Sequence, residues 1–176
     1  ASLIIQENSD SNNFSDMEAA IEIAMSFKDP SCTIIKHANP CGFGIGDNLT
    51  DAYHRAVSTD PVSYFGGIVG FNNKVDKSLA EYIVIPFLEC IIAPSFSNEA
   101  LEVLKQKKNL RVIAINTKFH SDSINVKSVF GGFLIQERDL IEDDFSSLKL
   151  VTEKKFSKEE YKAFEIGWKL VKNVKS

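Results

Sequence analysis

Two adjacent side chains, Lys36 and His37, follow a short apolar run and could exchange protons with a ligand. The run at residues 33–35 is rich in β-branched residues, which predicts a buried strand. An imidazole exchanges protons near neutrality, and an ammonium donates hydrogen bonds and stabilises negative charge. Open α/β sheets bind ligands outside the carboxyl ends of their strands, so we expect the pair at such an edge. A loop with a hydrogen-bonded histidine and a solvated lysine is the alternative, and spacing alone leaves both open.

Glycines follow this pair and recur further along the chain. Residues 39–46 contain an Asn-Pro step and three glycines, which predicts a loop whose backbone a ligand can approach closely. Gly66 and Gly67 open the apolar run 68–71 and could act in the same way, although a bulge or close strand packing explains them equally well. Glu89 borders another apolar run, either as a solvated strand end or as a carboxylate beside a pocket.

Composition narrows the class of protein. A chain of 176 residues with 44% hydrophobic content predicts one globular domain, or a little more, with a substantial core. A net charge of -4 argues against a nucleic-acid binder, which needs clustered cations. No apolar run approaches the roughly 20 residues of a membrane span, so no membrane partner is expected. Three cysteines without a CxxC spacing predict no disulfide framework and favour the reducing cytoplasm.

Hydrophobic periodicity predicts helices that alternate with strands, and this alternation favours a layered α/β sheet. The first helix is expected to start at the capping-box pair Ser15 and Glu18, and the last at the pair Ser157 and Glu160. Helices are predicted at residues 15–27, 50–58, 78–85, 98–107 and from 157 to the end, and Ser97 is expected to cap the fourth of them. Residues 83–85 are equally good strand material. Strands are predicted at residues 3–5, 33–35, 68–71, 89–93, 110–115 and, set apart from the others, 129–136. The last helix carries an apolar stripe that needs a partner surface, made of Tyr161, Phe164, Trp168 and Val171.

A zinc site is considered because Cys41 lies four residues after His37, and because Cys32 and Cys90 are expected on neighbouring strands. Zinc deaminases combine a His or Cys ligand, a nearby glutamate and a PCxxC segment. Here no second cysteine follows Cys41 at that spacing, and Asn39 stands where the glutamate would be. We therefore predict no metal and interpret the cysteines as small buried residues. Motifs for a serine nucleophile, a P-loop or a dinucleotide site are absent from the sequence.

Five segments together resemble a known family: KHANPCG, DAYHRAVSTDPVSYFGGIVGFN, ECIIAPSFSNEALEVL, VFGGFLIQERD and WKLVKNVKS. They are similar, in order and spacing, to the transformylase portion of the family that combines 5-aminoimidazole-4-carboxamide ribonucleotide (AICAR) formyltransferase with IMP cyclohydrolase. The resemblance runs from about residue 12 to the end of the chain.

The resemblance implies a three-layer α/β/α fold of the cytidine-deaminase type that has lost its zinc. It implies formyl transfer from the co-substrate 10-formyltetrahydrofolate to the 5-amino group of AICAR, in the pathway to IMP. Lys36 and His37 match the family's catalytic pair, with the assignment of acid and base left open. The positions implied to shape the loop or to contact the substrate are Asn39, Pro40, Gly42, Phe65, Gly66, Gly67 and Glu89.

The same resemblance predicts how this chain relates to a larger protein. Residues 1–14 would be a linker, residues 15–138 a deaminase-like domain, and residues 139–176 a linker and helix leading to a second half of the transformylase. A cyclohydrolase domain and a homodimer with a shared active site are also implied. The alternative function is a non-catalytic α/β module that binds folate or a nucleotide. We expect the isolated chain to fold but to transfer formyl groups poorly.

Overall fold

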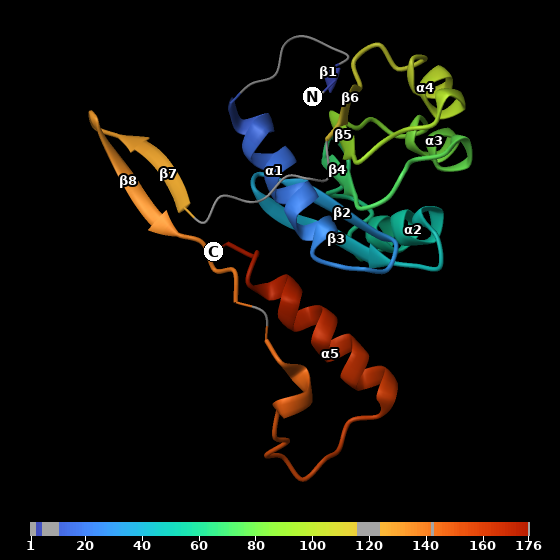
Figure 1. Ribbon diagram of the computed structural model, residues 1–176. Coiled ribbons are helices and arrows are strands. Elements are labelled where there is room, and N and C mark those ends of the chain that lie inside the picture. Colours follow the sequence, from blue (N-terminus) through green and yellow to red (C-terminus); the bar gives the residue numbers. More distant parts are fainter. Residues whose placement is uncertain (1–2, 5–10, 116–123, 142, 176) are drawn as a thin grey trace. The chain divides into compact units, whose positions relative to one another are not determined.

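The computed structural model describes residues 3–4, 11–115, 124–141 and 143–175, and its chain forms two compact units (Figure 1). The first unit comprises Ala1–Thr117 together with Gly167–Ser176, and the second comprises Lys118–Ile166. The limits of these two units do not coincide with the domain boundaries predicted after residues 14 and 138, and those boundaries stay a prediction.

A six-stranded sheet forms the centre of the first unit, in the order β1-β6-β5-β4-β2-β3. Strands β4, β5 and β6 run parallel, whereas β2 is antiparallel to both β3 and β4, and β1 is antiparallel to β6. The strands are β1 (Leu3–Ile4), β2 (Ser31–Lys36), β3 (Asn39–Ile45), β4 (Ile68–Phe71), β5 (Cys90–Ala93) and β6 (Arg111–Ala114). The sequence predicted each of these except β3.

Helices cover both faces of this sheet. Helix α1 (Ser11–Met25) lies on one face, so close to β4 that a Cβ added to Gly70 would be 2.4 Å from the carbonyl oxygen of Ala20. The other face carries α2 (Leu49–Thr59), α3 (Lys77–Ile83) and α4 (Asn98–Leu104), which share one buried apolar cluster with Ile34 and Ile91. The predicted three-layer α/β/α class is therefore confirmed (Figure 1).

Side-chain caps fix the starts of the three helices on that second face. Asn48, Asp76 and Ser97 each accept a hydrogen bond from a backbone N–H in the first turn of α2, α3 and α4. The predicted cap at Ser97 is confirmed. The predicted start of the first helix at Ser15 is wrong, because α1 begins at Ser11. A capping-box spacing can also fall inside a helix.

In the second unit, β7 (Ile124–Val129) and β8 (Gly132–Glu137) form a two-stranded hairpin, followed by the 3-10 turn η1 (Phe145–Ser147). The prediction of one strand at 129–136 is wrong, because the chain reverses at Phe130 and Gly131, both with positive φ. Its separation from the other strands is confirmed, since the hairpin is a sheet of its own.

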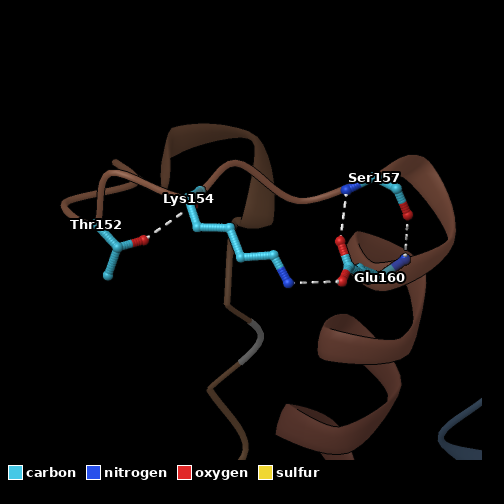
Figure 2. A network of polar contacts seen from close by, with 4 residues as sticks. All are labelled: Thr152, Lys154, Ser157 and Glu160. Carbon is cyan, nitrogen blue, oxygen red and sulfur yellow. Dashed lines mark hydrogen bonds and ion pairs between the residues drawn. The ribbon is translucent and has the colours of Figure 1, made fainter.

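Helix α5 (Lys158–Val171) starts with the predicted capping box, which is confirmed (Figure 2). The Ser157 hydroxyl accepts from the Glu160 N–H at 3.1 Å, and the Glu160 carboxylate accepts from the Ser157 N–H at 2.8 Å. Lys154 reaches the same carboxylate at 3.3 Å. None of the helices in the described residues is long and apolar enough to cross a membrane.

Candidate functional site

The Lys-His pair lies in a tight β-hairpin. Strand β2 ends at Lys36, which is in register with Asn39 at the start of β3, so that His37 and Ala38 form a two-residue turn. Both turn residues have positive φ, 53° and 61°. His37 is exposed and Lys36 half-buried. The predicted glycine loop at residues 39–46 is wrong, because most of it is strand β3.

The glycines of β3 accommodate a helix. Gly42 and Gly44 are two residues apart and so lie on one face of the strand. A Cβ on Gly42 would be 2.3 Å from the carbonyl oxygen of Ala56, and one on Gly44 would be 2.2 Å from that of Ala52. Helix α2 therefore occupies the space that the sequence had suggested for a ligand, and Gly42 faces this helix.

Two other residues of β3 fit an edge strand. Pro40 has no N–H to donate, and β3 lies at the edge of the sheet, where proline is tolerated. The register shifts between Ile34 and Ile35, which leaves Cys41 as the extra residue of a bulge. The side-chain oxygen of Asn39 accepts a hydrogen bond from the N–H of Lys175 at 2.7 Å.

A turn before β4 holds the ammonium of Lys36. The Gly67 N–H donates to the carbonyl of Tyr64 at 2.9 Å, and Gly66 at the third position has φ 70°, as a type II turn requires. The Phe65 carbonyl accepts a hydrogen bond from Lys36 Nζ at 2.6 Å. An ammonium has three N–H donors, so this contact fixes the position of the charge and uses one of them.

Backbone hydrogen bonds join this turn to the next strands. Gly66 donates to the carbonyl of Phe87 at 2.9 Å, Glu89 donates to that of Gly67 at 3.2 Å, and Arg111 donates to that of Glu89 at 3.0 Å. The structure therefore brings the Lys36 ammonium, the turn at Phe65 to Gly67 and Glu89 to one edge of the sheet. Because β2 is antiparallel to β4, this is the edge at which β4 and β5 begin. The prediction that the pair lies at the carboxyl ends of strands is thus correct for β2. It is wrong for the parallel strands β4 and β5, whose amino ends lie at this edge.

Phe87 belongs to this edge and was missed by the sequence analysis. Its ring lies 5.4 Å from that of Phe65 between centroids, and the two side chains are 44% and 57% exposed. A Cβ on Gly66 would be 3.5 Å from the Phe87 ring. The aromatic pair gives a flat ligand a surface on which to stack beside the ammonium. No motif marks Phe87, which follows a proline in an irregular segment.

The three cysteines are free thiols, and the prediction that they are buried is confirmed for Cys32 and Cys90 but wrong for Cys41, which is half-buried. Burial raises the pKa of the Cys90 thiol to about 12, raises that of Cys32 well above its ordinary value, and raises that of Cys41. All three therefore stay protonated near neutral pH. Strand β4 lies between β2 and β5, so the expectation that Cys32 and Cys90 occupy neighbouring strands is wrong. Within the described ranges no three His, Cys, Asp or Glu residues gather as metal ligands, and the absence of a metal stays a prediction.

Comparisons with known proteins point to one family. The profile of the AICARFT/IMPCHase bienzyme family matches residues 7–176. The bifunctional purine biosynthesis protein PurH of Bacillus cereus (strain B4264) is 48% identical over 166 residues, which cover 94% of this chain and 32% of that protein. PurH of Bacillus thuringiensis (strain Al Hakam) gives the same identity and coverage. The chain thus spans about a third of the length of these curated relatives.

A solved structure of Acinetobacter baumannii RibD, form 1, matches 57% of this chain and 34% of its own, with 16% identity and a TM-score of 0.44. That likeness is too distant to bear on the site. The family match is much stronger, since residues 7–176 make up almost the whole chain and this range contains the edge described above. The chain belongs to the AICARFT/IMPCHase bienzyme family.

Proposed function

We propose that this chain supplies the Lys36 and His37 side of a formyl-transfer site. The reaction would move the formyl group of 10-formyltetrahydrofolate to the 5-amino group of AICAR, giving the formylated ribonucleotide and tetrahydrofolate. The observation that carries the proposal is the placement of an anchored ammonium and an exposed imidazole in consecutive positions, beside an open aromatic pair. Family membership supports the same reaction class.

The chemistry explains why two such groups are needed. The amine is a weak nucleophile, because its lone pair is delocalised into the imidazole-carboxamide. Its nitrogen attacks the formyl carbon, a C–N bond forms, and His37 takes a proton from the amine. The carbonyl oxygen becomes an oxyanion that the Lys36 ammonium stabilises. The oxyanion then re-forms the carbonyl as the bond from the formyl carbon to N10 of the folate breaks, and N10 receives a proton from Lys36. The opposite assignment of acid and base balances equally well.

The neighbouring groups suit a flat, polar substrate. The exposed rings of Phe65 and Phe87 could stack on a heteroaromatic ring. Glu89 directly precedes β5 at the same edge, where its carboxylate could accept a hydrogen bond from an amide or amine. Asn39 shares the register position of Lys36 and could orient the carboxamide. In this proposal Gly42 acts through the packing of β3 on α2.

Other parts of the site would come from outside this chain. Formyl transfer needs a ribonucleotide phosphate and a folate held together, because the rate depends on the effective concentration of the two reacting groups. The curated relatives are about three times as long as this chain. We infer that regions such as those, or a second copy in a homodimer with a shared site, complete the pocket. A cytoplasmic location belongs to the same proposal.

The experiment compares this 176-residue chain with a longer polypeptide that adds the regions found in the curated relatives. Tetrahydrofolate release from 10-formyltetrahydrofolate is measured with and without AICAR. We expect AICAR-dependent turnover from the longer polypeptide and little or none from the shorter one. If the longer polypeptide bound AICAR and the folate, as measured by calorimetry, without turnover, the alternative of a binding module would replace the enzyme.

A further inference from the structure

The turn that carries His37 has a backbone conformation that its second residue does not favour. Two-residue hairpin turns with positive φ at both positions usually take Asn and Gly there. A Cβ disfavours the left-handed region, and histidine is tolerated there better than alanine. Ala38 nevertheless has φ 61° and no side-chain group that could bond its own backbone. Contacts from outside the hairpin must therefore hold the turn in this conformation.

Asp16 of helix α1 supplies such a contact. Its Oδ1 accepts a hydrogen bond from the N–H of Ala38 at 2.7 Å, in a partly buried position. Hydrogen bonds to a carboxylate are shorter and stronger than those between neutral groups. The contact links residues 22 positions apart, and so it joins the helical layer to the hairpin.

Helix α1 is itself firmly placed, which makes Asp16 a fixed reference point. Its own residues Met17 and Ala20 are buried, and the backbone of Ala20 lies against Gly70 of β4. A turn held by a carboxylate on this helix therefore keeps its orientation relative to the sheet. The N–H that donates to Asp16 belongs to the peptide bond between His37 and Ala38. Holding this peptide in place therefore also sets the direction in which the His37 side chain leaves the backbone.

We propose that Asp16 is a positioning residue for His37, which rests on the proposed function of the Lys36 and His37 pair. Asp16 touches no reacting atom. It holds the N–H of Ala38 and thereby keeps the imidazole within reach of the amine that loses its proton. Loss of this contact lets the turn relax to a conformation that alanine prefers and moves the imidazole away. The expected consequence is a lower kcat with little change in KM, since the surfaces that bind the ligand remain.

The first test uses the longer polypeptide in which formyl transfer is measured. Asp16→Ala should lower kcat about 10-fold or more and leave KM within about twofold, because a small misplacement of a reacting group is costly. Asp16→Asn keeps an acceptor oxygen and should retain most of the rate. The matched control is Asp76→Ala, which removes a carboxylate bond to a backbone N–H at the start of α3. It should lower stability and leave kcat unchanged.

A second variant tests the turn itself. Glycine takes φ 61° without a Cβ penalty, so adding Ala38→Gly to Asp16→Ala should recover kcat at least threefold. A purely structural role of Asp16 would lower the melting temperature of both variants without this recovery. Should Asp16→Ala fail to fold, hydrogen exchange of the Ala38 N–H in the wild type decides the question. It should be slowed at least 10-fold relative to an unstructured peptide, and an unprotected N–H would overturn the inference.

The outcomes separate this inference from the proposed function. An active Asp16→Ala together with an impaired His37→Ala would sink the positioning role and leave the formyl-transfer site intact. Wild-type turnover by His37→Ala would instead remove the site on which Asp16 is proposed to act, whatever the exchange rate of Ala38.

Discussion

Two hairpins in this chain share a type of turn and differ in what surrounds it. The hairpin of β2 and β3 turns through His37 and Ala38, with φ values of 53° and 61°. The hairpin of β7 and β8 turns through Phe130 and Gly131, with φ values of 44° and 81°. Asp16 holds the first turn by a hydrogen bond. Around the second, Phe130 is fully exposed and a Cβ on Gly131 would meet nothing within 4 Å.

The difference shows where strain is retained. The second turn has a glycine in the left-handed region, which is the usual solution for a two-residue hairpin. The first has a histidine and an alanine there, and neighbouring elements hold them in place. Strained turns without glycine persist where the surrounding structure determines them, and they occur preferentially at functional sites. The comparison therefore favours the first hairpin as the one that does chemistry.

The largest expected effect comes from removing the ammonium at the first hairpin. Lys36→Ala should lower formyl transfer about 100-fold or more, the usual scale for a general acid or for oxyanion stabilisation, because Nζ is anchored at Phe65, where the proposed function requires a cation. The measurement is AICAR-dependent release of tetrahydrofolate by the longer polypeptide. The control is Lys74→Ala, which removes an exposed cation from the same unit and should leave the rate unchanged. Equal rates in the two variants would contradict the role of Lys36.

The next largest expected effect is on stability, where replacing a glycine by alanine should affect the first hairpin more than the second. Gly44→Ala would place a Cβ 2.2 Å from the carbonyl oxygen of Ala52 and should lower the free energy of unfolding by about 1–3 kcal/mol. The matching change in the second hairpin, Gly132→Ala, meets its nearest atom at 3.7 Å and should shift it by less than about 0.5 kcal/mol. Urea unfolding of both variants is the measurement. A Gly44→Ala protein as stable as the wild type would show that α2 does not approach β3 this closely.

Alkaline pH should destabilise the core that holds the first hairpin. Burial raises the pKa of Cys90 from 9.0 to about 12, so above pH 9 the unfolded chain binds fewer protons at this thiol than the folded one. Stability from this group is complete below pH 9 and is lost as pH rises towards 12, by about 1.4 kcal/mol per pH unit. Urea unfolding at pH 8 and pH 10 measures the loss. The slope should diminish in Cys90→Ala, and an unchanged slope would exclude Cys90 as the cause.

The smallest expected effects come from exchanging the turn residues. Gly131→Ala should destabilise the second hairpin by about 1 kcal/mol, because alanine is disfavoured at φ 81°. Ala38→Gly should change the first by less than about 0.5 kcal/mol, since relief of strain is offset by the freedom that glycine adds to the unfolded chain. Amide exchange across each hairpin measures both changes. A large loss on Ala38→Gly would mean that the turn is not strained.

Elements with a strong period or a cap could be predicted from the sequence. Strand β4 was placed correctly from its apolar run, and α4 was found from its cap at Ser97. The capping box of α5 was likewise predicted from Ser157 and Glu160. These signals are local, because each depends on residues within a few positions of one another.

Features that depend on distant packing could not be predicted. A glycine marks either a turn or a close approach, and only the docking of α2 shows that Gly42 and Gly44 belong to the second kind. Lys36 and His37 were identified as a pair from local sequence, but the ring of Phe87 and the carboxylate of Asp16 reach this edge through tertiary contacts. The antiparallel pairing of β2 with β4 is likewise not encoded in any local sequence pattern. This pairing decides which ends of the neighbouring strands lie beside Lys36.

The most direct test of the account is the formyl-transfer rate of His37→Ala in the longer polypeptide, measured in a single turnover with saturating AICAR and 10-formyltetrahydrofolate. His37 is exposed in a turn and contributes nothing to the core, so the variant should stay folded, with only a small loss of stability because alanine is less favoured than histidine at φ 53°. We expect a folded protein that binds both substrates and transfers the formyl group about 100-fold more slowly or worse. A folded variant that transfers it at the wild-type rate would contradict the central claim that this hairpin carries the reaction.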